Sequence, residues 1–295
     1  MPGLRSGFVG LIGRPNVGKS TILNYYLGEK IAIISPHPQT TRHRIAGVLT
    51  REDAQVIFLD TPGLHKPQHA LGRSMMEAAK AVIEDADVLV GVIDATAGVT
   101  PEDERVFERL QRARQPALLA INKIDRVKKP RLLPVLEACA GLGLFRECIP
   151  ICALTGEQMD RLLAAVLALL PEGPSWYEPH QRTDQTTKQR IAEFIREPIL
   201  LATRQEVPHA VAVLVEGIRD AERVTVIEAT ILVEREGQKA ILIGRGGAML
   251  KRIGQAARGE LERLLGRQVY LQLWVKLAQG WRSDERLLRE LGYHG

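Results

Sequence analysis

A run of eight residues near the N-terminus has the types and spacing of a phosphate-binding loop: Gly13-Arg14-Pro15-Asn16-Val17-Gly18-Lys19-Ser20. It follows the apolar stretch 8–12 and precedes a helix-forming stretch that begins at Thr21, as such a loop requires. The glycines let backbone N–H groups turn toward a phosphate, and the positive end of the helix faces the anion. Lys19 adds a charge at the outer phosphates, and Ser20 supplies a hydroxyl for Mg²⁺. We therefore expect residues 14–21 to bind a nucleotide rather than to form a plain glycine turn.

A second motif selects the base. The apolar run 117–121 predicts a buried strand, and Asn122-Lys123-Ile124-Asp125 follows at its end, where open parallel sheets bind ligands. The Asp125 carboxylate can accept hydrogen bonds from guanine N1–H and the 2-amino group, whereas adenine offers no such pair of donors. The stem of Lys123 can lie over the base. In this order behind a phosphate loop, the motif indicates guanine binding rather than a polar turn.

A third motif, Asp60-Thr61-Pro62-Gly63, lies between the other two and follows the predicted strand 56–59. A carboxylate at a strand end can hold Mg²⁺ directly or through water. Gly63 can bring its N–H close to a γ-phosphate. A simple Pro-Gly turn is the alternative. The position after a strand and the order of the three motifs favour the binding site.

The elements that hold these motifs alternate between strands and helices, as a parallel sheet with crossover connections requires. The alternation ends with the apolar helical run 162–170, and several Pro and Gly residues follow it from Pro171 to Pro179. We therefore predict a first domain over residues 1–172, a linker over 173–187 and a second domain over 188–295. In the second domain we predict a helix over 188–204, broken or bent near Pro198, and strands over 210–215 and 224–234.

The second domain contains the loop Gly244-Arg245-Gly246-Gly247, which separates a short apolar segment from an amphipathic helix over 248–265. A strand is predicted over 269–275. A Gly-x-x-Gly loop lets the backbone approach a sugar-phosphate chain without interference from a Cβ atom. By itself such a loop is better explained as a glycine turn, but the basic helix and the flanking strands favour single-stranded nucleic acid. The residues expected to bind it are Ile243, Gly244, Arg245, Gly246, Gly247, Lys251 and Arg252.

The charge distribution supports a polyanionic partner for this second domain. The chain of 295 residues has a net charge of +5, yet residues 1–180 hold 21 basic against 20 acidic residues. Within 238–276 there are eight basic and two acidic residues, which is the local excess that nucleic-acid binding predicts. We expect no transmembrane segment and no signal peptide. Cys139, Cys148 and Cys152 lack metal-ligand spacing, so we expect free thiols in a reducing cytoplasm.

The three nucleotide motifs resemble the GTPase superfamily of P-loop proteins, over about the first 170 residues. The resemblance implies binding of GTP or GDP with Mg²⁺. It places Gln39-Thr40-Thr41-Arg42-His43 in the first switch loop, where one Thr binds Mg²⁺ and the γ-phosphate; we select Thr41, with Thr40 as the alternative. The implied magnesium ligands are Ser20, Thr41 and Asp60, and the implied catalytic residues are Lys19, Thr41 and Gly63.

The fifth motif of that superfamily normally reads Ser-Ala-Leu or Ser-Ala-Lys, whereas this chain has Cys152-Ala153-Leu154. The backbone N–H of Ala153 can still face the guanine O6. A Cys in place of Ser weakens only a turn hydrogen bond, so we retain all three residues as predicted guanine contacts.

The order of the two domains, with Pro38-Gln39-Thr40-Thr41-Arg42-His43-Arg44 at the switch, resembles the Era family over nearly the whole chain. The resemblance implies an α/β P-loop GTPase domain with a mostly parallel sheet, followed by a smaller α+β RNA-binding domain of the bacterial, type II KH class. It implies slow GTP hydrolysis, binding near the 3′ end of 16S ribosomal RNA and action in assembly of the 30S subunit. It also implies a cytoplasmic monomer, and it allows peripheral association with the inner face of the cell membrane.

The expected chemistry is slow because no Gln follows the Asp60 motif to orient the attacking water. The next residues are Leu64 and His65, and a His in a switch is more often a bystander than a catalyst. Catalysis would therefore rest on Lys19, Mg²⁺ and backbone N–H groups. Some GTPases that lack the Gln have an Asn in the phosphate loop that helps to hold K⁺, and Asn16 matches it. The alternative is that Asn16 only shapes the turn.

Two other function classes stay open from the sequence. One is a GTPase that uses a KH-like domain for another RNA, such as tRNA, or for a membrane-associated role. Crosslinking to bound RNA and sequencing would separate it from ribosome assembly. The other is an ATP-dependent enzyme such as a kinase, in which ATP would displace labelled GTP.

Overall fold

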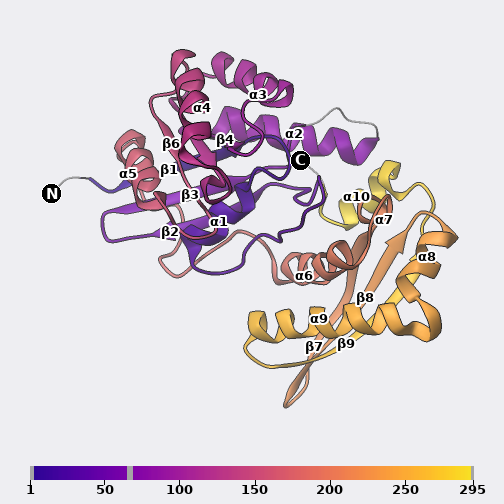
Figure 1. The fold of residues 1–295 in the computed structure, drawn as a ribbon. Coiled ribbons are helices and arrows are strands. Elements are labelled where there is room, and N and C mark those ends of the chain that lie inside the picture. The colour runs from indigo at the N-terminus through magenta and orange to yellow at the C-terminus, as the bar shows by residue number, and fades with distance from the viewer. Residues whose placement is uncertain (1–2, 65–68, 294–295) are drawn as a thin grey trace.

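The computed structural model of the chain describes residues 3–64 and 69–293, and its N-terminal part is built on a sheet of the order β2-β3-β1-β4-β5-β6 (Figure 1). All strands of this sheet are parallel except β2, which runs antiparallel to β3. The expected, mostly parallel sheet is therefore confirmed. Its strands are β1 (Arg5–Ile12), β2 (Ile45–Thr50), β3 (Ala54–Asp60), β4 (Val88–Asp94), β5 (Ala117–Asn122) and β6 (Cys148–Pro150).

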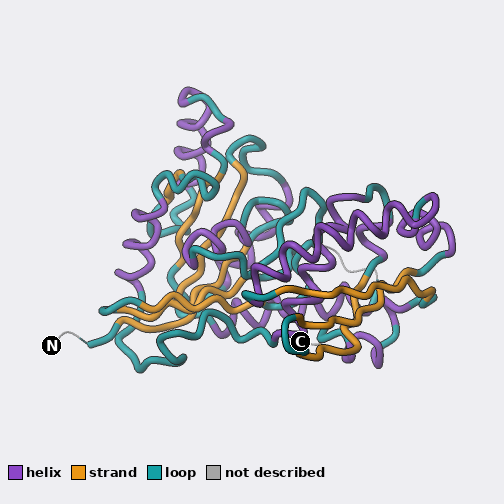
Figure 2. Tube along the Cα trace, turned by 90° about the horizontal axis from the view of Figure 1, so that it is seen from below, coloured by secondary structure: helices purple, strands orange, loops and turns teal. Residues whose placement is uncertain are grey.

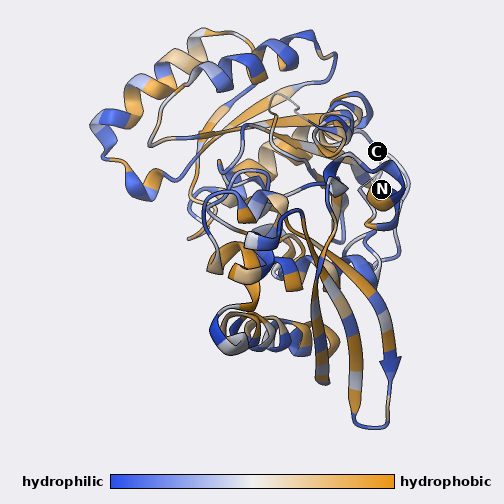
Figure 3. Ribbon diagram, turned by 90° about the vertical axis from the view of Figure 1, so that its right-hand side faces the viewer, coloured by the Kyte–Doolittle hydropathy of each residue, from blue (hydrophilic) through white to orange (hydrophobic). Residues whose placement is uncertain are grey.

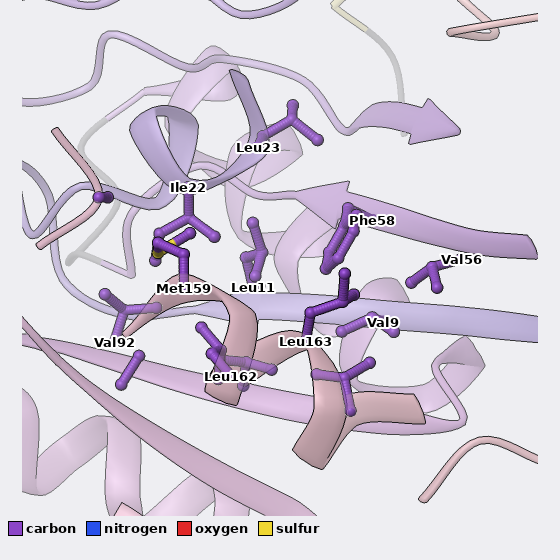
Figure 4. Close-up of a cluster of buried hydrophobic side chains, with 14 of the residues drawn as sticks. Val9, Leu11, Ile22, Leu23, Val56, Phe58, Val92, Met159, Leu162 and Leu163 are labelled. Carbon is purple, nitrogen blue, oxygen red and sulfur yellow. The ribbon is translucent and has the colours of Figure 1, made fainter. Parts of the chain in front are cut away.

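Helices cover both faces of this sheet, because its strands are apolar on both sides. Helices α1 (Lys19–Leu27) and α5 (Met159–Leu169) pack on one face, and Figure 4 shows their side chains meeting residues of β1, β3 and β4. The other face is covered by α2 (Ala70–Asp85), α3 (Pro101–Arg112) and α4 (Lys129–Gly141). The carboxyl ends of the parallel strands remain uncovered by these layers, which leaves them available for a ligand.

Two helix starts near the expected site differ in how their backbone N–H groups are satisfied. At α3, Thr100 and Asp103 form a capping box around Pro101, so backbone N–H groups at the start of this helix are bonded to side chains of the helix itself. At α1 the N-cap is Gly18, with φ of 106° and no side-chain cap. The first N–H groups of α1 are thus left for an external acceptor such as a phosphate.

The C-terminal part is a second α+β unit, whose three-stranded sheet lies apart from the first sheet (Figure 2). Its central strand β8 pairs antiparallel with β7 and parallel with β9. Helices α6 and α9 lie on one face and enclose an apolar core with the strands (Figure 1). In chain order the elements are α6 (Thr187–Ala202), α7 (Val207–Ala210), β7 (Ala212–Asp220), β8 (Val224–Val233), α8 (Glu236–Ile243), η2 (Arg245–Gly247), α9 (Ala248–Leu265), β9 (Gln268–Leu277), η3 (Trp281–Ser283) and α10 (Glu285–Glu290).

Three details of this unit differ from the sequence-based expectation. The strand predicted from residue 210 begins at Ala212 and continues to Asp220, because Val207–Ala210 form the short helix α7. The apolar segment before the glycine loop is helix α8, whose Leu242 is fully buried. Of the break or bend predicted near Pro198, the break is absent, since α6 runs without interruption from Thr187 to Ala202 with the proline inside. Figure 3 shows that hydrophobic and hydrophilic residues follow one another along β7, β8 and β9, the three strands of this unit.

The segment predicted as a linker is bound along the edge of the first sheet. The backbone N–H of Val48 donates to Arg182 O over 2.8 Å, and the Thr183 hydroxyl donates to Ala46 O over 2.7 Å. Gln55 accepts from the backbone N–H groups of residues 176 and 177. These bonds tie the connection to β2 and β3, so it is not a free tether.

Candidate functional site

The phosphate loop follows β1 and curves around the amine of Lys19, which is 6% exposed. Lys19 Nζ donates to Gly13 O over 2.9 Å and to Arg14 O over 3.0 Å. Burial lowers the pKa of Lys19 to about 8, although the Asp60 carboxylate nearby opposes that shift. A phosphate bound at the loop would raise the pKa of Lys19 again, because it brings a negative charge next to a desolvated cation.

Three side chains converge beside this loop on the proposed magnesium position. Ser20 Oγ donates to Asp60 Oδ2 over 2.6 Å, Thr41 Oγ1 reaches the same oxygen over 3.2 Å, and the two hydroxyls are 3.1 Å apart. Asp60 is fully buried, and burial raises the pKa of its carboxyl. Its Oδ1 has no hydrogen-bond partner within the described residues. A buried oxygen without a donor, next to two hydroxyls, fits a hard divalent cation.

The two threonines of the first switch loop face different ways. Thr40 Oγ1 donates to His37 O over 2.7 Å and lies 2.7 Å from Ser35 Oγ, so its hydroxyl closes a turn within the loop. Only the hydroxyl of Thr41 points to Asp60. This geometry supports Thr41 rather than Thr40 as the switch ligand.

The base-recognition residues are linked to each other and to the phosphate loop. Asn122 Nδ2 donates to Val17 O over 2.8 Å, which ties the end of β5 to the phosphate loop. Lys123 Nζ donates to Asn16 O and to Asp94 Oδ2, each over 2.6 Å, so its stem stretches across the loop. These bonds fix the entrance of the predicted guanine pocket.

The Asp125 carboxylate is held by the unusual cysteine of the fifth motif. Cys152 Sγ donates to Asp125 Oδ1 over 3.1 Å, so the thiol takes the orienting position that we expected to be weakened. The N–H of Ala153, expected at guanine O6, donates instead to Asn122 Oδ1 over 3.0 Å. Leu154 is 76% exposed and points away from the buried residues of the motif. The guanine contacts of Ala153 and Leu154 thus stay predictions.

Gly63 lies against the phosphate loop, as its predicted role requires. A Cβ atom on Gly63 would sit 2.6 Å from the backbone nitrogen of Pro15, so only glycine allows this approach. Leu64 is partly buried against the core, and His65 lies outside the described residues. Asn16 has φ of 64°, and its Nδ2 donates to Pro36 O over 2.7 Å, which joins the phosphate loop to the switch loop.

A pocket of about 500 Å³ is lined by the phosphate loop, by Thr40 and Thr41, by Gly63 and by Lys123. Its lining includes neither Asp125 nor residues 152–154, but it does include several residues that the sequence did not indicate. Leu201 of α6 lines it, together with Ile33 and Ile34 of the segment before the switch loop and Arg126 beyond Asp125. Leu201 lies in an apolar helix far along the chain, so no local pattern marks it as a nucleotide contact. The C-terminal unit thereby forms part of the wall of the nucleotide pocket.

The glycine loop of the C-terminal unit has an open outer side. Gly246 and Gly247 have φ of 59° and 81°, and a Cβ atom on either would meet nothing within 4 Å. The loop therefore needs glycine for its backbone conformation and leaves room for an incoming chain. Arg245, Lys251 and Arg252 are exposed around it, whereas Ile243, Gly244 and Gly247 are half-buried. The predicted RNA-binding residues thus share one accessible surface.

Comparisons with known proteins agree with this two-part arrangement. Residues 8–123 match the family model of the 50S ribosome-binding GTPases, and residues 206–282 match that of the KH domain. Within the described ranges, no helix has the length and apolarity that a membrane span requires.

Two solved structures resemble the chain over its whole length. One is Era in complex with MgGDPNP and nucleotides 1506–1542 of 16S ribosomal RNA, at 41% identity and a TM-score of 0.96. The other is a variant of Era from Aquifex aeolicus bound to GDP·AlF₄⁻, with the same identity and TM-score. Each match covers 99% of this chain and 100% of the other chain.

Proposed function

The chain belongs to the Era family of GTPases, and from that premise we propose that it binds the 3′ end of 16S ribosomal RNA during 30S subunit assembly. It binds guanine nucleotides with Mg²⁺ and hydrolyses GTP to GDP and phosphate. The proposal depends on the presence of two sites in one chain. The nucleotide site has the cluster of Ser20, Thr41 and Asp60 at the phosphate loop, and the RNA-binding surface has the open Gly-x-x-Gly loop beside α9. Crosslinking the protein to ribosomal RNA in cells and sequencing the bound RNA tests it.

The residues that we propose for hydrolysis act by position and charge. Lys19 would neutralise the outer phosphates, Ser20 and Asp60 would hold Mg²⁺, and Thr41 would close the switch onto both. The N–H of Gly63 would meet the γ-phosphate, because the backbone there already lies against the phosphate loop. Mg²⁺ supplies positive charge at the β- and γ-oxygens when bound. A slow rate follows, since no side chain in this set orients the attacking water.

We also propose domain limits of 1–172 and 188–295 with a connection over 173–187. The isolated pairing of Glu172 with Arg5 supports the first limit. The connection itself stays bound to β2 of the first domain through Thr183. The start of α6 at Thr187, capped by Thr186, supports the second. We also propose that the protein is a monomer in the cytoplasm, which size-exclusion chromatography with light scattering and cell fractionation test. Fractionation also tests peripheral binding to the inner membrane face.

Hydrolysis is expected to run faster in KCl than in NaCl at equal ionic strength, because a K⁺ held by Asn16 would add charge beside the phosphates. Asn16 lies at the mouth of the nucleotide pocket, and its amide nitrogen is already bonded to Pro36 O. The amide oxygen is then the atom that would face the cation. Steady-state phosphate release in the two salts measures the difference, and Asn16→Ala should erase it.

Gln39→Ala serves as a control for that experiment, since Gln39 lines the same pocket and also has a positive φ, 64°. It perturbs the switch loop without removing Asn16, so the difference between salts should persist. Equal wild-type rates in KCl and NaCl would contradict the K⁺ prediction. The role of Asn16 would then be limited to its hydrogen bond to the switch loop.

RNA affinity is expected to fall at least tenfold when Arg245 and Gly246 are both changed to Asp. Two carboxylates would repel the phosphate backbone, and a side chain at Gly246 would occupy the space beside the loop. GTP hydrolysis without RNA should survive, because the loop lies outside the nucleotide pocket. Fluorescence anisotropy with a 3′-terminal 16S RNA oligonucleotide at fixed salt measures the change.

Arg286→Asp is the matched control, because Arg286 is exposed on α10 and not part of the glycine loop. The control should lose only the small affinity that one distant charge contributes. A double variant that binds RNA as tightly as Arg286→Asp does would rule out the loop as the RNA site.

A further inference from the structure

A second cavity, of about 1040 Å³, opens between the phosphate loop, α2 and α3, two helices that cover the same face of the sheet (Figure 1). Pro15, Asn16 and Gln39 line both this cavity and the nucleotide pocket, so the two spaces adjoin at the phosphate end. Its volume suits a ligand of nucleotide size. Neither the nucleotide site nor the RNA surface described above accounts for it.

Positive charge dominates the lining of this cavity. The basic residues are Arg14, Arg73, Lys80, Arg105 and Arg109, and the acidic ones are Glu77 and Glu102. The Arg14 guanidinium lies 3.3 Å from the buried carboxylate of Asp103, so its charge is compensated. In the described part of the chain, the other four cations form no ion pair with a carboxylate. An excess of uncompensated cations around a hollow attracts an anion.

One of these cations has a donor in need of an acceptor. Arg109 Nη1 is buried and has no hydrogen-bond partner among the described residues. Buried donors are nearly always paired, so a donor left unpaired at a cavity indicates a missing acceptor. A phosphate oxygen is such an acceptor, because guanidinium groups bind phosphates through charge-assisted hydrogen bonds. Leu64, Met76 and Pro38 give the same cavity an apolar portion.

We propose that this cavity is a second anion site that binds a small phosphorylated ligand of nucleotide size beside the GTP site. The phosphates would lie against Arg73, Arg105 and Arg109, and the rest of the ligand would pack on Leu64 and Met76. A small ligand fits better than an RNA strand, because the space lies between a loop and two helices and its volume is close to the upper end of the range for small-ligand clefts. Since the two sites share Asn16 and Gln39, occupancy of this site should alter the affinity for GTP.

The test uses the full-length protein saturated with Mg²⁺ and GDP, so that the guanine site is blocked. Isothermal titration with inorganic pyrophosphate and with ATP should then detect one further site. Arg73 and Arg105 are both exposed, so the double variant Arg73→Glu, Arg105→Glu should fold and should weaken that binding at least tenfold. Arg112→Glu is the matched control on α3, because Arg112 is exposed and does not line the cavity.

The outcomes separate this site from the other functions of the chain. Absence of pyrophosphate and ATP binding to the GDP-saturated wild type overturns the proposal, as does binding that the double variant retains. Binding of an RNA oligonucleotide alone, lost in the double variant, would assign the cavity to the RNA backbone and also overturn it. If the double variant fails to fold, Lys80→Glu provides the same comparison. RNA binding through the Gly-x-x-Gly loop stands or falls separately, because Arg245 is far along the chain in the other unit.

Discussion

Asp125→Asn is expected to weaken GTP binding at least tenfold and to make xanthosine triphosphate the preferred nucleotide. The carboxylate of Asp125 would accept from guanine N1–H and the 2-amino group, and an amide replaces one of these acceptors with a donor. Hydrogen bonds to a charged group contribute about 1.5–3 kcal/mol, which corresponds to roughly ten- to hundredfold in affinity. Xanthine has a carbonyl in place of the 2-amino group and would accept from the new donor. Competition of GTP and XTP against a fluorescent guanine nucleotide measures the exchange.

The control for this experiment is Asp160→Asn on α5, an exposed carboxylate outside the nucleotide pocket. The Asp125 side chain is one-third exposed and accepts from Cys152, so its amide should keep the shape of the loop. Wild-type selectivity in Asp125→Asn would assign base recognition to other groups, such as the backbone at residues 153 and 154.

The nucleotide end of this molecule could be predicted from the sequence because its chemistry is local. The phosphate loop and the segments at Asp60 and Asn122 each follow an apolar strand, and strand ends in a parallel sheet share one edge. That rule alone predicts that Ser20 and Asp60 meet, and they lie 2.6 Å apart. The same rule could not separate Thr40 from Thr41, since both are in a loop without periodicity.

Contacts between the two units could not be predicted, because hydrophobic periodicity in the sequence does not show how one domain packs against another. Ile33, which precedes the switch loop, packs into the core of the C-terminal unit, and Arg42 donates to Val211 O over 2.6 Å while buried. Burial lowers the pKa of Arg42 to about 10, with the charge of Arg196 as a further cause. Among the described residues Arg42 forms no ion pair with a carboxylate, and such a buried Arg has no sequence signature. Leu201 is the same case, because its role depends on how α6 docks against the nucleotide pocket.

Lys19→Ala is expected to abolish tight Mg²⁺·GTP binding while leaving the unliganded protein folded. In the wild type, saturation with nucleotide at a thousand times its Kd adds about 4 kcal/mol of stability, and the variant should lose nearly all of that increment. The loss follows from the position of Lys19, whose buried amine is held at the phosphate loop by Gly13 O and Arg14 O. Thermal unfolding with and without Mg²⁺·GTP measures it. Ser20→Ala should show the same loss, because it removes a proposed Mg²⁺ ligand that lies 2.6 Å from Asp60 Oδ2.

The unliganded variant should remain stable because the charge of Lys19 opposes folding. The pKa of Lys19 in the folded protein is about 8 against 10.5 for an ordinary lysine, so protonation at pH 7 costs about 3 kcal/mol. Removing the amine relieves that cost and offsets the loss of two hydrogen bonds and of packing.

The lowered pKa of Lys19 also predicts a pH dependence. In the wild type, Lys19 increases the free energy of unfolding as pH rises from about 8 to 10.5, and Lys19→Ala should lack this increase. Phosphate affinity of the wild type should fall over the same range, since only the protonated amine attracts the anion. Lys129→Ala, an exposed lysine on α4, should change none of these quantities. An unliganded Lys19→Ala protein whose melting temperature collapses would instead make Lys19 a structural residue of the loop.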